Sequence, residues 1–595
     1  MTIISRIDFS DPHNSAAPRL RHAFGAPRAV LVAHDLTEVL PVLDAVQAAA
    51  LKGCWCVGYL RYEAAPAFDA ALSVHASDGP LAWFAVYDQA LPWPQDPQGH
   101  AAALPVHWHE TCQRPAFGAA LDAVQRAIAA GELYQVNFTA PLVGAWQSMP
   151  GKNEADEKLA AQALFGALQR AQPGGYAAFI DTGDTQVLSV SPELFFDWQD
   201  GQILARPMKG TAARGTTPQA DAAQAAWLRS SPKERAENVM IVDLLRNDLS
   251  RIAEPFSVRV PRLFQAEALP SVWQMTSDVQ ARTRAGTTLA DVFAALFPCG
   301  SITGAPKVRA MQMIRALEPA PRGVYCGAVG VVRPGAFGKG IKATFNVPIR
   351  TVTVRTGALR CGIGSGITSG AMADGEWREW RQKRAFVERA SQPFELLETL
   401  ALEQGQLRHD TDHLNRLAVA AAHFGTPWDA SRVRRCLDEL TQTHPHGLWR
   451  VRLLLDFQGK PRAEAFAMEP SPAQVRLQLA DRAIEEADGE FVRFKTTRRA
   501  HYDAFTPTRP GVFDTVLWNA CGEITECTRG SLALRLDDCW VTPPLACGLL
   551  PGVGRALALR EGVLTEAVVR LNDLPRVQGW AFLNSLRGWI AAELV

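Results

Sequence analysis

The sequence predicts an α+β protein of two domains: a large domain of layered β-sheet and helix, followed by a smaller α/β domain. Its 595 residues are too many for one ordinary hydrophobic core. Strand-like runs and helical periodicities are mixed along the chain. At "SQPFELLETL" a Ser-Gln-Pro break precedes a new apolar run. We therefore expect domains over 1–388 and 392–595, the first divided into an N-terminal subdomain (1–110) and a core (110–388).

The composition is ordinary for a globular protein, with 21% charged and 47% hydrophobic residues. The 61 basic and 61 acidic side chains leave no net charge, which argues against binding to nucleic acid or to an anionic membrane surface. The N-terminus lacks the apolar run of a signal peptide, and no window reaches the length of a membrane span. The 11 cysteines show no zinc-type spacing, so we expect a protein of the reducing cytoplasm.

In the first domain, the runs "WCVGYLRY" and "LAWFAVYD" indicate strands. Helical spacing of Phe117, Leu121, Val124 and Ile128 ends at Gly131, after which "LYQVNFT" indicates a strand. Further helices are expected over 232–249, after Pro306 and over 376–390, and further strands over 325–332, 345–354 and 358–364.

In the second domain, "TDHLNRLAVAAAHFG" indicates a helix that stops at Gly425. The runs "WRVRLLLDF" and "GVFDTVLWN" indicate strands.

The histidines restrict the chemistry of the first domain. All 13 lie at or before His109 or at or after His409. Chemistry between these positions must therefore use carboxylates, lysine, hydroxyl groups or a hard metal ion.

One lysine of this block, Lys209, lies in the turn "ARPMKGTAARG", where Gly210 leaves room for a close approach. It is either a solvated loop charge or a nucleophile. Arg206 is a cationic neighbour in sequence that would favour the neutral amine.

Several carboxylates accompany this lysine. Glu193 follows a strand, Glu237 lies on a predicted helix, and Glu376 and Glu379 share a helix face if the helix has begun there. Carboxylates that converge without histidine suit Mg²⁺, although a single glutamate is more often a surface charge than a metal ligand. The glycine strand "CGIGSGI" could offer backbone amides to an anion.

Eight segments occur in the order found in chorismate-utilising enzymes: "AAGELYQVNFT", "SVSPELFF", "RPMKGT", "ERAENVMIVDLLRND", "FPCGSITGAPKVRAM", "GVYCGAVG", "FNVPIRT" and "DGEWREW". The resemblance covers roughly residues 110–388. It implies a chorismate-binding fold of layered sheets and helices, chorismate as substrate and Mg²⁺ as cofactor.

Within that family, the position of Gln135 is lysine in isochorismate and salicylate synthases and glutamine in aminating members. The position of Lys209 is alanine in most anthranilate synthases and lysine in aminodeoxychorismate synthases. The resemblance therefore implies amination through a covalent bond to Lys209. It also implies Glu193 as general acid, while Gln274 replaces a histidine of many relatives and leaves part of the proton delivery to Glu193.

The resemblance further implies ligands for the substrate and the metal. Mg²⁺ would bind Glu237 and Glu376 directly and Glu379 through water. The remaining substrate contacts would be Tyr325 and Arg350 for the enolpyruvyl carboxylate, and Gly362, Gly364, Ser365 and Gly366 for the ring carboxylate. No "G-x-C-x-G" nucleophile turn occurs in the chain, so ammonia would come from a separate glutamine amidotransferase or from solution.

The second domain contains Lys495 in "FKTTRRAHYDAF", followed by "GEITECTRGSLAL" and "TPPLACGLLPGVGR". Lys495 is either part of a solvated basic face or the lysine that pyridoxal phosphate requires. Glu526 could face the pyridine nitrogen. Thr528, Ser531, Gly552, Val553 and Gly554 could surround the phosphate.

This order resembles the fold-type-IV pyridoxal phosphate family, which includes aminodeoxychorismate lyase and branched-chain aminotransferase. The resemblance implies Arg452 as the phosphate-binding arginine, with Arg450 close enough to compete. Relatives commonly have asparagine in place of Ser531, and the domain is short for the family.

Together the resemblances imply synthesis of 4-aminobenzoate from chorismate, with a homodimer through the second domain. Two alternatives stay open. One is an anthranilate- or isochorismate-type synthase with an attached aminotransferase. The other is a second domain that serves only for docking or dimerisation.

Overall fold

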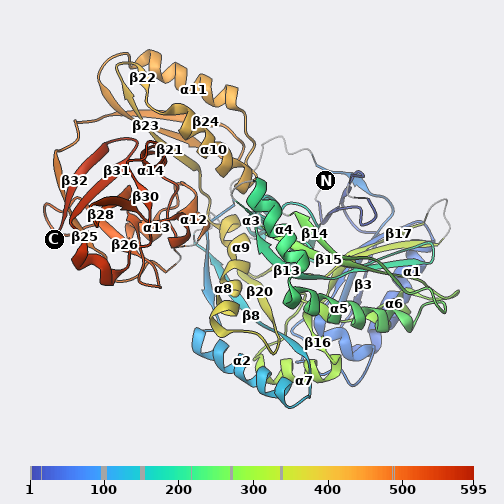
Figure 1. The fold of residues 1–595 in the computed structure, drawn as a ribbon. Coiled ribbons are helices and arrows are strands. Elements are labelled where there is room, and N and C mark those ends of the chain that lie inside the picture. Colours follow the sequence, from blue (N-terminus) through green and yellow to red (C-terminus); the bar gives the residue numbers. More distant parts are fainter. Residues whose placement is uncertain are drawn as a thin grey trace. The chain divides into compact units, whose positions relative to one another are not determined.

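The structure is a computed structural model that describes all residues except 1–2, 15, 95–102, 148–153, 216–217, 269–271, 336–339, 486 and 488. The chain forms two compact units, Met1–Pro393 and Phe394–Val595 (Figure 1). Each unit is described by itself.

The first unit is built on two large antiparallel sheets, counted over its described residues. The strands of the first sheet, in spatial order, are β16 (Gly304–Ala305), β8 (Gln135–Trp146), β20 (Ala358–Ile367), β19 (Thr351–Arg355), β10 (Thr185–Ser191), β9 (Tyr176–Asp181), β1 (Ser5–Phe9), β2 (Leu20–Phe24) and β6 (Leu91–Pro92), with β7 (Val106–Glu110) beside β8. Those of the second are β13 (Met208–Ala213), β15 (Val272–Arg282), β12 (Gln202–Arg206), β11 (Leu194–Gln199), β18 (Ile341–Asn346), β17 (Ala328–Pro334), β4 (Trp55–Leu60), β5 (Ala82–Tyr87) and β3 (Ala29–Ala33), with β14 (Arg259–Ala268) beside β15.

The hydrophobic clusters show that the sheets and helices form layers. One cluster joins residues of both sheets, such as Phe9 and Ile180 of the first and Tyr59 and Val331 of the second. The outer face of the second sheet packs on α1 (Leu36–Leu51), α5 (Pro232–Ser250) and α6 (Leu289–Leu296). The outer face of the first sheet packs on α2 (Arg114–Ala129), α3 (Glu154–Ala171), α7 (Lys307–Leu317), α8 (Ala373–Lys383) and α9 (Ala385–Ser391). Helix α4 (Pro218–Ser230) contacts β13, β14 and β15.

Strands β8 and β20 are neighbours in the first sheet, and their register places Gly362, Gly364 and Gly366 opposite Pro141, Thr139 and Asn137. Beyond Cys361 the pairing of β20 with β19 ends, so the edge of β20 from Gly362 onward has no strand partner on that side within the described residues. A backbone edge is therefore available where the glycines lie.

Most of the predicted elements are confirmed, including the helices now assigned as α2, α5 and α7. The strand expected over 345–354 is wrong as a single element, because Pro348 and the positive φ of Arg350 (50°) separate β18 from β19. The helix expected over 376–390 is broken at Arg384 into α8 and α9.

The second unit contains a small sheet in the order β22 (Gln406–Leu407), β21 (Leu396–Glu403), β23 (Leu448–Leu455), β24 (Pro461–Ala467), which packs on α10 (Asp410–Phe424) and α11 (Ala430–Thr443). Gly425 ends α10 in the left-handed conformation with φ of 66°, as predicted. The larger sheet has the order β27 (Ile524–Cys527), β26 (Asp514–Trp518), β25 (Gln474–Leu479), β32 (Gly588–Leu594), β31 (Gly579–Asn584), β28 (Ser531–Leu536), β29 (Cys539–Thr542), β30 (Thr565–Glu566). The unit also contains α12 (Glu490–Arg493), α13 (Ala500–Asp503) and α14 (Val553–Arg560).

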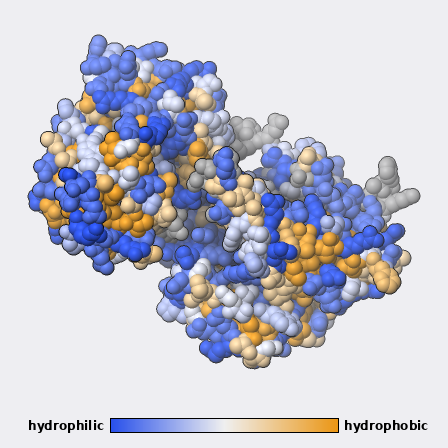
Figure 2. Space-filling view, in the orientation of Figure 1, coloured by the Kyte–Doolittle hydropathy of each residue, from blue (hydrophilic) through white to orange (hydrophobic). Residues whose placement is uncertain are grey.

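Figure 2 shows apolar patches on the visible surface of both units, separated by hydrophilic residues. The most exposed large apolar side chains in the described residues include Phe256, Met372 and Tyr134. Among the helices that the structure describes, none has both the length and the apolar character needed to cross a bilayer.

Candidate functional sites in the two units

Lys209 lies on β13 at a β-bulge. The pairing of β13 with β15 shifts register between Met208 and Thr211, and Gly210 has a φ of 94°. The Lys209 amine is directed at β20. The position that a Cβ atom on Gly366 would occupy is 2.9 Å from Lys209 Nζ and 3.0 Å from Gln135 Nε2. Three predicted site residues from three strands therefore converge.

Gln135, on β8, is fully buried, and neither its amide nitrogen nor its amide oxygen has a partner in the described part of the chain. Buried polar groups are almost always hydrogen bonded, so a bare amide at this point indicates a place for a polar ligand.

Neighbouring side chains leave no room for a Cβ atom at the glycines of β20. A Cβ on Gly362 would lie 2.4 Å from the Tyr325 ring, and one on Gly364 would lie 3.0 Å from the Tyr325 hydroxyl. Ser365, on the opposite face, is buried and donates its hydroxyl proton to Glu376. The alternation of β20 thus places Gly362, Gly364 and Gly366 on one face, whereas the side chain of Ser365, also predicted to contact the substrate, lies on the face that is linked to α8.

Arg350 precedes β19 and makes no side-chain hydrogen bond or ion pair with another described residue. Burial and the positive charge of Arg389 lower its pKa to about 10, so it stays charged at neutral pH. A partly buried, uncompensated guanidinium suits a planar carboxylate. Burial also raises the pKa of the Tyr325 phenol well above its usual value, which keeps it a hydrogen-bond donor.

Glu193, between β10 and β11, is buried, and its carboxyl accepts a hydrogen bond from Ser301 Oγ at 2.7 Å. Burial raises the pKa of Glu193 to about 7, although the Ser301 bond and the charge of Lys209 act in the opposite direction. The group is therefore protonated in part near neutrality, as a general acid requires.

The predicted metal ligands lie on two helices, Glu237 on α5 and Glu376 and Glu379 on α8. Glu234, which sequence reasoning missed, lies one turn before Glu237. Burial, followed by the charges of Glu237, Glu379 and Glu376, raises the pKa of Glu234. These carboxylates thus share one region in which further positive charge would be favourable.

No group of three or more metal-binding side chains in the described residues is already arranged as a coordination sphere. Lys383, a second residue that sequence reasoning missed, pairs with Glu379 at 2.8 Å and donates to the Gly364 carbonyl at 3.0 Å. The hard oxygen donors fit Mg²⁺ in type, and Lys383 supplies part of the compensating charge. Its spacing four residues after Glu379 was the signal available in the sequence.

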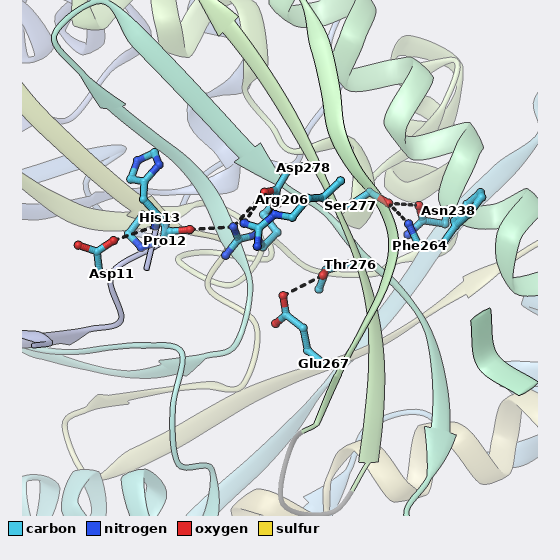
Figure 3. A network of polar contacts seen from close by, with 11 residues as sticks. Asp11, Pro12, His13, Arg206, Asn238, Phe264, Glu267, Thr276, Ser277 and Asp278 are labelled. Atoms are coloured by element: carbon cyan, nitrogen blue, oxygen red, sulfur yellow. Dashed lines mark hydrogen bonds and ion pairs between the residues drawn. The ribbon is translucent and has the colours of Figure 1, made fainter. Parts of the chain in front are cut away.

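One expectation about the surroundings of Lys209 is corrected. Arg206 does not face the amine, because its guanidinium pairs with Asp278 at 2.6 Å and donates to the Pro12 carbonyl (Figure 3). Gln274 uses its amide on the backbone beside Lys209, since Nε2 donates to the Gly210 carbonyl at 2.8 Å.

In the second unit, Lys495 follows α12. Burial and the positive charges of Arg416 and Arg499 lower the pKa of Lys495 to about 8. Glu526, on β27, is buried and accepts hydrogen bonds from Tyr502 Oη at 2.6 Å and from the Leu550 amide at 3.1 Å. Burial raises the pKa of Glu526 to about 7, and Lys495 is among the charges that act on it. The structure therefore brings the predicted lysine and acid together.

The predicted phosphate turn leads into α14. Gly552 is the residue before the helix, and a Cβ there would lie 2.5 Å from Ser531 Oγ. A Cβ on Gly554 would meet the Asn584 backbone at 2.7 Å. Val553 is buried between them. The hydroxyl of Ser531 thus faces a helix N-terminus, where an anion is favoured.

The arginine at this turn is Arg416, which sequence reasoning missed. Its guanidinium donates to the Pro551 carbonyl at 3.0 Å and forms a bidentate pair with buried Glu398. Although burial disfavours a charged carboxylate, Arg416 and His413 hold the pKa of Glu398 to about 2. Arg416 stands three residues after His413 on α10, within a quoted helix of the sequence.

Arg452 lies on β23 opposite Thr399 and Glu464, so its side chain shares a sheet face with Thr399 and not with Glu398. Arg450 is exposed and stacks over Phe466. The structure therefore favours Arg416 over both for the phosphate. The Thr528 hydroxyl and amide both donate to Asp514, so they are already used within the sheet.

Residues 16–389 match the chorismate binding enzyme family, and residues 395–595 match the class IV amino-transferases. The chain belongs to the chorismate binding enzyme family and carries a C-terminal class IV aminotransferase domain. That domain implies pyridoxal phosphate as its cofactor.

Among curated relatives, aminodeoxychorismate synthase component 1 of Klebsiella aerogenes is 41% identical over 272 residues, which are 46% of this chain and 57% of that protein. Anthranilate synthase component 1 of Neisseria meningitidis serogroup A is 38% identical over 230 residues, 39% of this chain and 46% of that protein. The chain thus spans about half the length of the curated relatives it matches. The crystal structure of anthranilate synthase component I from Streptococcus pneumoniae TIGR4 shares the fold, with a TM-score of 0.50, 22% identity and coverage of 65% of this chain and 91% of that chain.

Proposed function

We propose that this chain makes 4-aminobenzoate from chorismate in two steps. The first unit replaces the 4-hydroxyl group of chorismate with an amino group, and the second unit eliminates pyruvate from the product. The convergence of the Lys209 amine and the unpartnered Gln135 amide on Gly366 is the observation that carries the first step. The electrostatic interaction of Lys495 with Arg416 and Glu526 supports the second.

In the first step, Arg350 and Tyr325 bind the enolpyruvyl carboxylate, and Lys209 Nζ bonds to C2 of the ring as the C4–O bond breaks. Glu193, protonated in part near pH 7, gives its proton to the departing hydroxyl, which leaves as water. Ammonia then bonds to C4 and the C2–Lys209 bond breaks. Atoms balance as chorismate plus ammonia giving 4-amino-4-deoxychorismate plus water.

Mg²⁺ fits the same site. Glu237 and Glu376 would hold the ion directly and Glu379 through water, and the ion would neutralise the ring carboxylate of chorismate. The pKa of the neighbouring Glu234 is raised first by burial and then by the charges of Glu237, Glu379 and Glu376, and this second contribution supports a cation at the site. The pairing of Glu379 with Lys383 fits the more distant role of that carboxylate.

Ammonia would come from a separate glutamine amidotransferase or from solution. The curated relatives in this comparison are named component 1, which fits a second component that supplies nitrogen. We further propose a cytoplasmic location and a homodimer through the second unit.

In the second step, pyridoxal phosphate, when bound, withdraws electrons from the carbon that carries the amino group. Glu526 would face the pyridine nitrogen, held in place by Tyr502 and the Leu550 amide. Arg416, Ser531 and the amides at Gly552 to Gly554 would bind the phosphate. Lys495, with a pKa of about 8, can accept and return a proton near neutral pH as pyruvate leaves.

A second candidate is an anthranilate-type synthase with an attached aminotransferase, which the similarity to the Neisseria meningitidis protein favours. A product assay separates the two. Purified protein is incubated with chorismate, an ammonium salt, Mg²⁺ and pyridoxal phosphate. Because anthranilate and 4-aminobenzoate have the same mass, products are assigned by chromatography against both standards. We expect 4-aminobenzoate and pyruvate; ortho-aminated or hydroxylated product would overturn the proposal.

A further inference from the structure

The β-bulge at Lys209 and Gly210 decides which way the Lys209 amine points. Met208 pairs with Thr276 and Thr211 with Gln274, so two residues of β13 oppose Met275 alone. Removing the bulge would shift the register by one residue. Because side chains alternate along a strand, such a shift would turn Lys209 to the other face of the sheet, away from Gly366.

A bulge interrupts the ladder, so its carbonyl groups need other donors. Here side-chain amides supply them. Gln274 Nε2 donates to the Gly210 carbonyl at 2.8 Å, and Asn238 Nδ2 lies 3.5 Å from the Lys209 carbonyl. A carbonyl can only accept, so in each amide it is the nitrogen that faces the bulge.

The orientation of both amides is fixed by hydrogen bonds that their oxygen atoms accept. Thr211 Oγ1 donates to Gln274 Oε1 at 3.2 Å. Ser277 Oγ donates to Asn238 Oδ1 at 2.6 Å, a contact between β15 and α5 that Figure 3 shows. There is little room for a side chain at position 210, since a Cβ there would lie 3.0 Å from Glu234 Oε2 and 3.3 Å from Met275 Cβ.

We propose that Gln274 is a positioning residue: its amide holds the bulge through the Gly210 carbonyl and thereby directs the Lys209 amine toward β20 and the substrate. Asn238 supports the same bulge through the longer contact. The inference rests on the proposed function only in taking Lys209 as the reacting group.

The test uses the full chain with two substitutions that remove the donor at nearly constant size, Gln274→Glu and Gln274→Met. The control is Gln265→Glu, the same chemical change at an exposed glutamine of β14, whose amide donates to the Leu263 carbonyl. We expect kcat for 4-amination to fall about 10- to 100-fold in both Gln274 variants. The KM for chorismate should stay within about threefold, because the Gln274 amide is already engaged by the Gly210 carbonyl and the Thr211 hydroxyl. The control should resemble wild type.

A second readout follows the amine itself. Lysines are acetylated with and without chorismate, and the Lys209 peptide is quantified by mass against exposed Lys52. In the wild type and in Gln265→Glu, chorismate should protect Lys209; in the Gln274 variants, protection should be lost although chorismate still binds.

The outcomes separate the two proposals. Wild-type kcat and full protection in the Gln274 variants would overturn the positioning role and leave the proposed function intact. A raised KM with unchanged kcat would also overturn it, because Gln274 would then be a substrate contact. If Lys209→Ala itself still forms 4-aminated product, the proposed function fails first.

Discussion

The surroundings of the two candidate catalytic lysines differ in how they would favour reaction of the amine. Lys495 is set among positive charges, and burial together with Arg416 and Arg499 lowers its pKa to about 8. Lys209 stands on a bulge whose carbonyls are held by amides, and the groups near its amine are the Gln135 amide and the Glu193 carboxyl. The comparison suggests that the second unit tunes the proton affinity of its lysine, whereas the first unit tunes its position.

Replacement of Lys209 is the most severe way to test this contrast. Lys209→Ala should reduce formation of 4-amino-4-deoxychorismate about 10³-fold or more, because the bond to C2 can no longer form. Chorismate binding, measured by calorimetry, should change little. Normal turnover in this variant would contradict the covalent role.

Replacement of Lys495 should stop the pathway one step later. In Lys495→Ala, 4-amino-4-deoxychorismate should accumulate while release of pyruvate slows about 10²- to 10⁴-fold. The rates of the two steps, followed separately by chromatography and by a pyruvate assay, check this. Normal 4-aminobenzoate formation would assign the second unit a purely structural role.

The structure favours Arg416 as the phosphate-binding arginine, whereas the sequence suggested Arg452, and replacing each residue tests which assignment is right. Arg416→Gln should weaken pyridoxal phosphate binding about 10- to 100-fold, because a charge-assisted hydrogen bond is lost. Arg452→Gln should change it by less than about threefold. Titration of cofactor absorbance measures both. An unfolding curve is needed as well, because Arg416→Gln leaves the buried Glu398 with His413 but without its arginine partner.

The pH profile of the first step gives the smallest expected effect. Glu193 must be protonated to act as an acid, and its pKa is raised to about 7. The rate should therefore be highest below pH 7 and fall about tenfold per pH unit well above it. Glu193→Gln should be slower and should lose this dependence. A wild-type rate that rises through pH 7 would mean that Glu193 acts as a base.

Short-range patterns in the sequence predicted the helices, the glycine strand and the two lysines, because each depends on neighbours in the chain. Contacts between distant segments could not be predicted in that way. Arg416 meets Pro551 from 135 residues away, and Gln274 meets Gly210 from 64 residues away. A glutamine in a strand has no local pattern that separates a surface amide from one that supports a bulge. The roles carried over for the metal and substrate ligands remain predictions.

Strand β20 has one face that is packed in the core and one face that is formed by glycines. Its odd-numbered residues Cys361, Ile363 and Ile367 are packed in the core against the helices, while its glycines lie on the face that Tyr325 and Lys209 approach. A tightly packed interior absorbs little displacement. An extra methyl group behind Ile363 would therefore displace the backbone that carries the glycines, so the packing of this core also sets the position of the proposed substrate-binding face.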